Sequence, residues 1–160
     1  MSKFILGIRS KLNLRGVHPH LVAVVNKAIS NTEVDFTVTE GLRSVARQKE
    51  LVAAGASKTM NSRHLTGHAV DLAAIVNGKV RWDWELYFFI ARAMQIAARD
   101  TLTPIVWGGV WDKLLNNLSD DLQAEHTAYV MRRKKLGKRA FGDAPHFELS
   151  SKTYPVTTKE

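Results

Sequence analysis

Three side chains able to bind a divalent metal ion lie in two separate parts of the sequence. His64 and Asp71 are seven residues apart, and His146 follows much later. Imidazole and carboxylate groups are ligands that zinc accepts, and a catalytic zinc takes three protein ligands with one position left open for water. Gly67 allows a tight turn between the first two, so residues 69–73 can run on as a strand. The residue types and their number indicate a catalytic metal site.

A further acidic residue, Asp143, precedes His146 by three positions. This spacing puts a carboxylate near the metal site without making it a ligand, which suits a general base. Two histidines and an aspartate without a contiguous motif are weak evidence by themselves. The sequence has no His-Glu-x-x-His helix, no Gly-x-Ser-x-Gly elbow and no phosphate-binding glycine loop. Residue types alone leave open a metal hydrolase and a basic α+β domain of another function.

The remaining histidines need no metal to explain them. A lone histidine is more often a surface or hydrogen-bonded residue than a ligand, and we expect this of His18, His20 and His126. Arg43 falls in a loop between a predicted strand and a predicted helix, where functional residues often lie. A plain surface arginine is the alternative for this position.

Length and composition indicate one ordinary globular domain. The chain has 160 residues, 45% of them hydrophobic, which is enough for a single core. It contains no cysteine, so disulfides, thiol catalysis and Cys-based zinc sites are excluded. The net charge of +8 predicts attraction to polyanions. Nucleic acid, anionic envelope polymers, lipopolysaccharide and phospholipid are all candidates on charge alone.

The pattern along the chain predicts an α+β fold, with a small, mostly antiparallel sheet that carries the zinc site and packs against several helices. Hydrophobic periodicity predicts helices at 20–30, 44–54, 84–100 and 119–136, and strands at 34–39, 69–73, 79–82, 103–107 and 146–149. Ser44 and Asp83 are the expected N-caps of two helices. Asn77-Gly78 predicts a hairpin turn. The last strand could place His146 beside Asp71.

No export or membrane segment is expected. The apolar patch at the N-terminus is too short for a signal-peptide core, and the run 86–98 is interrupted by Arg92 and Gln95. We therefore expect synthesis as a soluble cytoplasmic protein. The basic residues at 132–139 form either a solvated helix end or a contact for an anionic envelope surface. The tail 150–160 is expected to be loose.

Two blocks of the sequence resemble a known family. Residues 62–71 read SRHLTGHAVD, which is similar to the Ser-x-His-x-x-Gly-x-Ala-x-Asp signature of the D-Ala-D-Ala carboxypeptidase (VanY-type) zinc peptidases, a family that includes the L-alanyl-D-glutamate endopeptidases used by phages as endolysins. Residues 143–146, DAPH, resemble the second block, where an aspartate is typical of the phage enzymes. Further similarity lies in 36–43, 107–109 and 145–149, and in all it extends from about 19 to 149.

The resemblance implies one peptidase domain over 1–160, with its core at about 19–149 and no separate cell-wall-binding domain. It implies a bacteriolytic zinc enzyme that cuts the L-Ala–D-Glu bond of the peptidoglycan stem peptide. The implied zinc ligands are His64, Asp71 and His146, and the implied base is Asp143. Arg43 would contact the substrate or the transition state, and Ser62, His68 and Trp107 are expected to bind substrate.

The resemblance also sets expectations about partners. Phage relatives commonly have an acidic residue directly after Trp-Gly-Gly, whereas this chain has Val110, which argues against a regulatory calcium ion. A monomer that needs a holin to reach the wall is expected. Two alternatives share the zinc site, namely a D-Ala-D-Ala carboxypeptidase and a non-catalytic wall-binding module. A specific nucleic-acid binder is disfavoured, because the basic cluster lacks interleaved aromatic residues.

Overall fold

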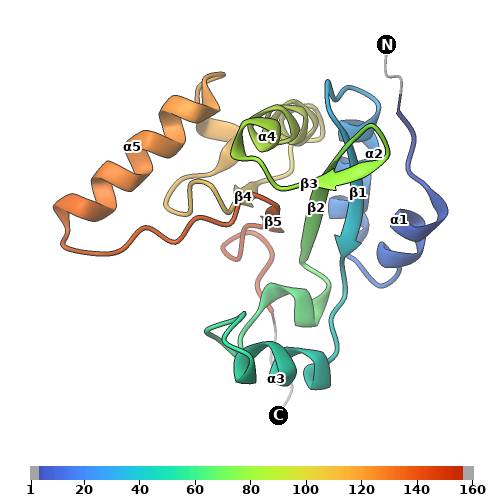
Figure 1. The fold of residues 1–160 in the computed structure, drawn as a ribbon, viewed down its shortest axis with the longest axis horizontal. Helices are drawn as coiled ribbons and strands as arrows, with labels where there is room; N and C mark the ends of the chain where they lie inside the picture. Colours follow the sequence, from blue (N-terminus) through green and yellow to red (C-terminus); the bar gives the residue numbers. More distant parts are fainter. Residues whose placement is uncertain (1–3, 157–160) are drawn as a thin grey trace.

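The computed structural model describes residues 4–156 and contains the predicted helices and strands in the predicted order (Figure 1). Its α-helices are α1 (Ile8–Asn13), α2 (Pro19–Ile29), α3 (Val45–Ala53), α4 (Trp84–Asp100) and α5 (Leu122–Lys135). Its strands are β1 (Asp35–Glu40), β2 (Ala69–Val76), β3 (Lys79–Arg81), β4 (Ile105–Trp107) and β5 (His146–Leu149). Two short 3-10 helices, η1 (Arg63–Thr66) and η2 (Leu115–Asn117), complete the list. The predicted α+β class is confirmed.

A five-stranded sheet forms the centre of the fold. Its main path runs β1-β2-β5-β4, and β3 pairs with the far half of β2 through the predicted hairpin. Each of the pairings is antiparallel. Strand β2 has neighbours on both edges, and consecutive residues on its two faces are buried, which explains its long apolar run, AVDLAAIV. It is the strand from which the functional residues are positioned.

Strand register brings distant residues into one row across the sheet. Asp71 on β2 pairs with His146 on β5, as predicted, and with Glu40 on β1. The β1 register shifts just before this point, between Val38 and Glu40. Directly opposed residues on neighbouring strands have their side chains within reach of each other. Three polar side chains therefore meet at one end of a sheet whose remaining positions are mostly apolar.

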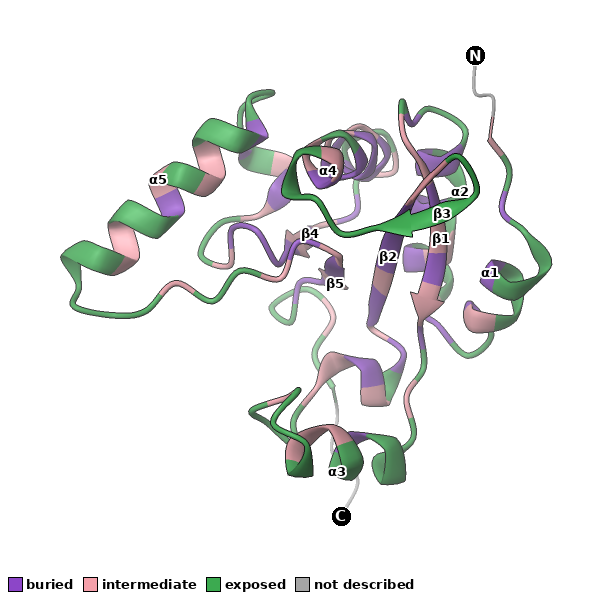
Figure 2. Cartoon of the chain, in the orientation of Figure 1, coloured by how far each residue is buried: buried purple, intermediate pink, exposed green. Residues whose placement is uncertain are grey.

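Helices α2 and α4 provide most of the core that supports this sheet. They pack against each other, and α4 also contacts β2 and β4 (Figure 2). Helix α2 buries one stripe, at helical spacing, and α4 buries residues over much of its circumference, as expected of a central helix. Ser44 caps α3 as predicted, by accepting a hydrogen bond from the Arg47 amide. Asp83 does not cap α4 with its side chain, because that carboxylate pairs with Arg81 instead.

Both ends of the described chain pack against the hydrophobic core more closely than the sequence indicated. The short helix α1 was not predicted; it packs beside β1, and Leu6, Leu14 and Val17 belong to the hydrophobic core. The core therefore begins well before residue 19. Residues 150–154 are also held, since Ser150 is buried and the Tyr154 ring packs on the core. The expectation of a loose tail is wrong for this part, and its last residues, 157–160, lie outside the described chain.

Helix α5 contacts the body through Leu122 and Tyr129, which are buried, and through His126, whose ring stacks on Trp84. Its basic end extends away from the sheet (Figures 1 and 2). Among residues 4–156, no helix combines the length and the apolar character needed to cross a bilayer.

Candidate active site

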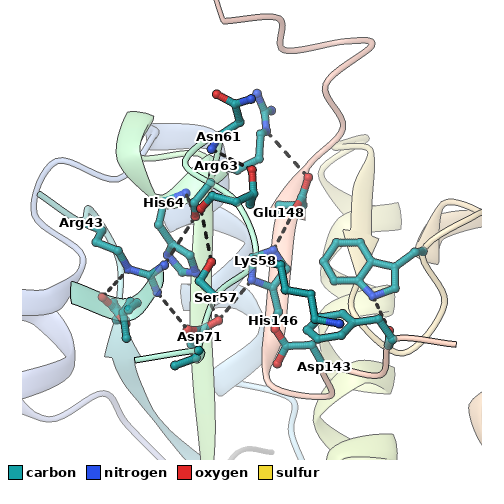
Figure 3. A pocket seen from close by; sticks show the side chains of 18 residues that line it. Arg43, Ser57, Lys58, Asn61, Arg63, His64, Asp71, Asp143, His146 and Glu148 are labelled. Carbon is teal, nitrogen blue, oxygen red and sulfur yellow. Dashed lines mark hydrogen bonds and ion pairs between the residues drawn. The ribbon is translucent and has the colours of Figure 1, made fainter. Parts of the chain in front are cut away.

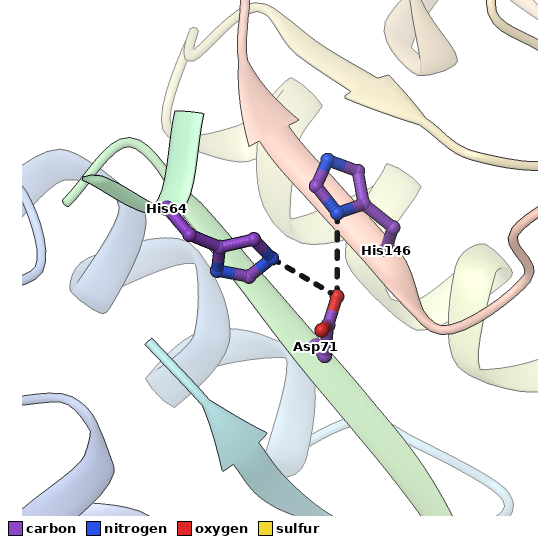
Figure 4. A group of neighbouring side chains, drawn as sticks. All are labelled: His64, Asp71 and His146. Carbon is purple, nitrogen blue, oxygen red and sulfur yellow. Dashed lines mark hydrogen bonds and ion pairs between the residues drawn. The ribbon is translucent and has the colours of Figure 1, made fainter. Parts of the chain in front are cut away.

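The three predicted metal ligands lie together near the N-terminal end of β2 (Figure 4). The Nε2 atom of His64 is 3.3 Å from Oδ1 of Asp71, and Nδ1 of His146 is 3.2 Å from the same oxygen. Both imidazoles are buried, with 2% and 7% of their surface exposed. His64 reaches this point because η1 ends at Gly67, whose left-handed backbone (φ 75°) turns the chain into β2. The predicted tight turn is confirmed.

Each histidine is held by a hydrogen bond from the ring nitrogen that points away from Asp71. His64 Nδ1 lies 2.9 Å from the carbonyl oxygen of Gly41, and His146 Nε2 lies 2.7 Å from Oε1 of Glu148. Histidines that bind metals nearly always have such an outer partner, which fixes the ring and its tautomer. The sequence did not suggest either partner. The two remaining nitrogens are thereby directed at one point.

The spacing of these atoms fits a zinc ion. Zinc bonds to imidazole nitrogen and carboxylate oxygen are about 2.0–2.1 Å long, so neighbouring ligands of a tetrahedral ion lie roughly 3.4 Å apart. The two nitrogen–oxygen distances of 3.3 and 3.2 Å are close to that value. Two imidazoles and one carboxylate are also a donor set that zinc prefers. The residues present therefore fit the metal that the sequence predicted.

The pKa values of the site reflect its closely packed charges. Burial alone would raise the pKa of Asp71, but hydrogen bonds with His146 and His64 outweigh it and lower that pKa far below its usual value. Burial would likewise lower the pKa of His146, whereas Asp71 and Glu148 raise it to about 10. Without a metal, the proton that His146 retains supplies positive charge next to Asp71. A divalent cation would replace this proton.

Asp143 lies beside the three residues without joining them (Figure 3). Burial raises its pKa; His146 opposes this shift and the charge of Asp71 adds to it. A carboxylate whose pKa is raised holds a proton more readily, as a general base must. The turn after Asp143 is fixed by a hydrogen bond from the His146 amide to the Asp143 carbonyl, 3.1 Å long.

The Trp107-Gly108-Gly109 segment shapes the turn that presents Asp143. The Gly108 amide donates to the His146 carbonyl and the Asp143 amide donates to the Gly108 carbonyl, both at 2.8 Å. A Cβ on Gly108 would lie 2.0 Å from the Asp143 carbonyl oxygen. Trp107 is fully buried, and its indole N–H donates to the Ala144 carbonyl at 2.8 Å. The predicted substrate contact for Trp107 is therefore wrong; it supports the turn from within the core.

Gly108→Ala is expected to lower activity at least 10-fold and stability by about 1–3 kcal/mol, the usual cost of overpacking. The new methyl group must push the Asp143 segment away from β4. Kinetics together with thermal unfolding would measure both effects. Gly7→Ala is the matched control, since a Cβ there meets no atom within 4 Å. Unchanged activity in Gly108→Ala would show that the position of Asp143 is not critical.

Arg43 has more partners than the sequence suggested. Its Nε lies 2.6 Å from Glu40 Oε1, and its other nitrogens reach Asp71 Oδ2 at 3.8 Å and Gln48 Oε1 at 2.8 Å. Only 8% of its side chain is exposed. The guanidinium is thus fixed beside the candidate metal ligands, with its charge already facing two carboxylates.

These groups lie in a cleft of about 650 Å³ (Figure 3). One side is formed by the loop 55–61, and Trp111 and Phe141 line it as well. Trp111 is close to the candidate metal ligands, because its ring centre is 5.2 Å from that of His146. The volume is within the range of small-molecule and peptide pockets. Lys58, Trp111, Phe141 and Glu148 were not identified from the sequence, because only the fold brings them to the cleft.

The remaining predicted residues divide between cleft and surface. Ser62 lines the cleft and accepts a hydrogen bond from the His64 amide. His68 does not line it; its Nδ1 bonds Thr66 Oγ1, and its ring is 5.6 Å from that of His18. The predicted substrate contact for His68 stays a prediction, since this side chain lies outside the lining of the cleft.

The three histidines expected to be structural are hydrogen-bonded in the structure. His18 accepts from the His20 amide at the start of α2, and His20 pairs with the Tyr154 hydroxyl at 2.8 Å. His126 lies 2.6 Å from the Gly109 carbonyl and stacks on Trp84. None of them belongs to the candidate metal site formed by His64, Asp71 and His146.

Three residues that could hold a metal ion, a neighbouring aspartate outside that set and a cleft beside them are together the arrangement typical of a mononuclear metallohydrolase. Residues 1–150 match the family described as phage L-alanyl-D-glutamate peptidase. The chain belongs to this family.

Individual relatives agree with this assignment. The L-alanyl-D-glutamate peptidase of Escherichia phage T5 is 32% identical over 113 residues, which are 68% of this chain and 82% of that protein. That of Listeria phage A118 is 28% identical over 153 residues, 90% of this chain, and the chain spans only 48% of that longer protein. The crystal structure of the Serratia marcescens L-Ala D-Glu endopeptidase ChiX is 42% identical, with a TM-score of 0.74 over 96% of each chain.

Proposed function

We propose that this protein is a zinc-dependent peptidoglycan endopeptidase that hydrolyses the L-Ala–D-Glu bond of the stem peptide. The observation that carries the proposal is the convergence of His64, Asp71 and His146, with two nitrogen–oxygen distances suited to one zinc ion and ligand atoms all within 4.8 Å of one another. Family membership and the activities for which the relatives are named support the choice of bond. Bound zinc would act as a Lewis acid that polarises the scissile carbonyl and makes water more acidic.

The protein's own residues would perform the proton transfers. Asp143 would accept a proton from the attacking water and then deliver it to the leaving amine of the glutamyl residue. Arg43, held by Glu40 and Gln48, would face the negative charge that develops on the carbonyl oxygen. Because these contacts hold the guanidinium before substrate arrives, little reorganisation is needed during the reaction.

The test is mass spectrometry of purified peptidoglycan after digestion, with a chelator and with zinc added back. Fragments that begin with D-Glu, lost on chelation and restored by zinc, are expected. Release of D-Ala would instead identify a carboxypeptidase. Binding without any zinc-dependent product would leave a non-catalytic wall-binding module.

The basic end of α5 would contact an anionic envelope surface. Arg132 is paired with Asp112, whereas the exposed Lys134, Lys135 and Lys138 have no ion pair within residues 4–156. Exposed Met131 and Leu136 lie among these charges. Such a mixture suits the surface of anionic lipid or polymer. Release of a monomeric enzyme from the host cytoplasm through a holin-permeabilised membrane remains part of this proposal.

A further inference from the structure

Three cationic side chains line the cleft, and they differ in what already neutralises them. Arg43 lies against Glu40 and Asp71. Arg63 lies 3.8 Å from Glu148 and donates to the backbone carbonyls of Leu149 and Tyr154, so it is committed to the C-terminal segment. Lys58 alone of the three has no carboxylate partner within the described residues.

Lys58 also stands at the open side of the cleft. Its side chain is exposed, and its ammonium lies over the Phe141 ring, 5.8 Å from the ring centre. Figure 3 shows Lys58 among the residues that line the pocket with Asp143 and His146. A cation–π contact at an exposed site is worth only about 0.5–1 kcal/mol. A carboxylate that entered the cleft would therefore be a stronger partner for this ammonium than the ring is.

The loop that presents Lys58 is anchored to the active site by a buried amide. Gln48 is fully buried, and its Nε2 donates to Ser57 Oγ at 2.9 Å and to the Thr59 carbonyl. Its Oε1 accepts from Arg43. Both residues that flank Lys58 are thus tied through one side chain to Arg43. This connection holds the base of the lysine in place relative to the catalytic groups.

We propose that Lys58 binds the free carboxylate of the glutamyl residue in the substrate and so determines specificity for glutamate over its amide. This inference rests on the proposed function. A glutamyl residue uses one of its two carboxyl groups to continue the peptide, so the other stays free within a few bonds of the amine released by cleavage. The carboxylate would lie on the leaving-group side of the scissile bond. Arg43 and Arg63 are unsuited to this task, since each already faces a protein carboxylate.

The test compares two synthetic stem peptides that differ only in this group, one with the free glutamyl carboxylate and one with a carboxamide. The zinc-loaded wild type is expected to prefer the carboxylate. Lys58→Met should lower kcat/KM for the carboxylate peptide by about 10–100-fold, the range for a lost hydrogen bond to a charged group. Most of the loss should be in KM. The carboxamide peptide should change less than about threefold, and Lys58→Arg should restore the preference.

Lys49→Met is the matched control, because it removes the same charge from exposed α3 without lining the cleft. Equal losses on both peptides in Lys58→Met would overturn the proposal and show that the lysine only supports its loop. A preference that survives the substitution would overturn it as well. Cleavage of neither peptide by the wild type would refute the proposed function, and the role of Lys58 would fall with it.

Discussion

Asp143→Asn is expected to reduce kcat by about 10²–10⁴-fold, the usual contribution of general acid–base catalysis, while zinc binding persists. The amide keeps the shape of the side chain but cannot accept the proton from water. Asp143 lies outside the His64, Asp71 and His146 set, so its removal takes no ligand from the metal. Steady-state kinetics with a quantified stem peptide, together with zinc content by elemental analysis, would measure the two effects separately.

The same substitution gives a second, independent readout in stability. Burial raises the pKa of Asp143, with a further rise from the nearby Asp71 charge. A raised pKa in the folded state means that the ionised carboxylate opposes folding at any pH above its ordinary value. Asp143→Asn removes this cost, so the metal-free variant should melt at the same or a higher temperature at neutral pH. A lower melting temperature would assign Asp143 a structural role, and retained activity would exclude it as the base.

The candidate metal ligands and the local turns of the site could be predicted from the sequence alone. His64, Asp71 and His146 could be grouped because zinc chemistry restricts the residue types and because the strand at 146–149 was visible from its pattern. The β2–β5 register then confirmed that Asp71 and His146 are paired. Local signals, such as the turn at Gly67, were equally readable, since they depend on near neighbours in the chain.

The interactions that tune the site were not predictable, because they depend on contacts between distant segments. The second partner of His64 is a backbone carbonyl, that of Gly41, and any residue would supply one. The burial of Trp107 follows from its place on β4 beneath the Asp143 turn, which a one-dimensional pattern cannot distinguish from exposure in a cleft. Lys58 comes from a polar loop with no periodicity at all. Its significance appears only when the partners of Arg43 and Arg63 are known.

Asp71→Asn is expected to lose zinc binding as well as activity, whereas Asp143→Asn loses activity and keeps zinc. Loss of an outer hydrogen-bond partner typically weakens metal binding by about 10–100-fold, so loss of a direct ligand should cost more than this. In the wild type, zinc at 100 times its dissociation constant should stabilise the fold by about 2.7 kcal/mol. That corresponds to a rise of roughly 5–10 °C in melting temperature for a chain of this size. The variant should lose most of this rise.

Competition with a chromophoric chelator would measure the zinc affinity of Asp71→Asn, and thermal unfolding with and without zinc would measure the lost stabilisation. Asp83→Asn is the matched control, as it makes the same change at an exposed ion pair with Arg81. Stoichiometric zinc of unchanged affinity in Asp71→Asn would show that the ion is held elsewhere.

Stability without metal provides the sharper distinction between the two aspartates. Hydrogen bonds with His146 and His64 outweigh burial and lower the pKa of Asp71, so its ionised form favours folding. That contribution is fully present above the ordinary aspartate pKa and is lost as the pH falls through the lowered value. Metal-free Asp71→Asn should therefore be less stable than wild type at neutral pH, whereas metal-free Asp143→Asn should not. One isosteric substitution at two neighbouring carboxylates would thus separate the group that holds the ion from the group that moves the proton.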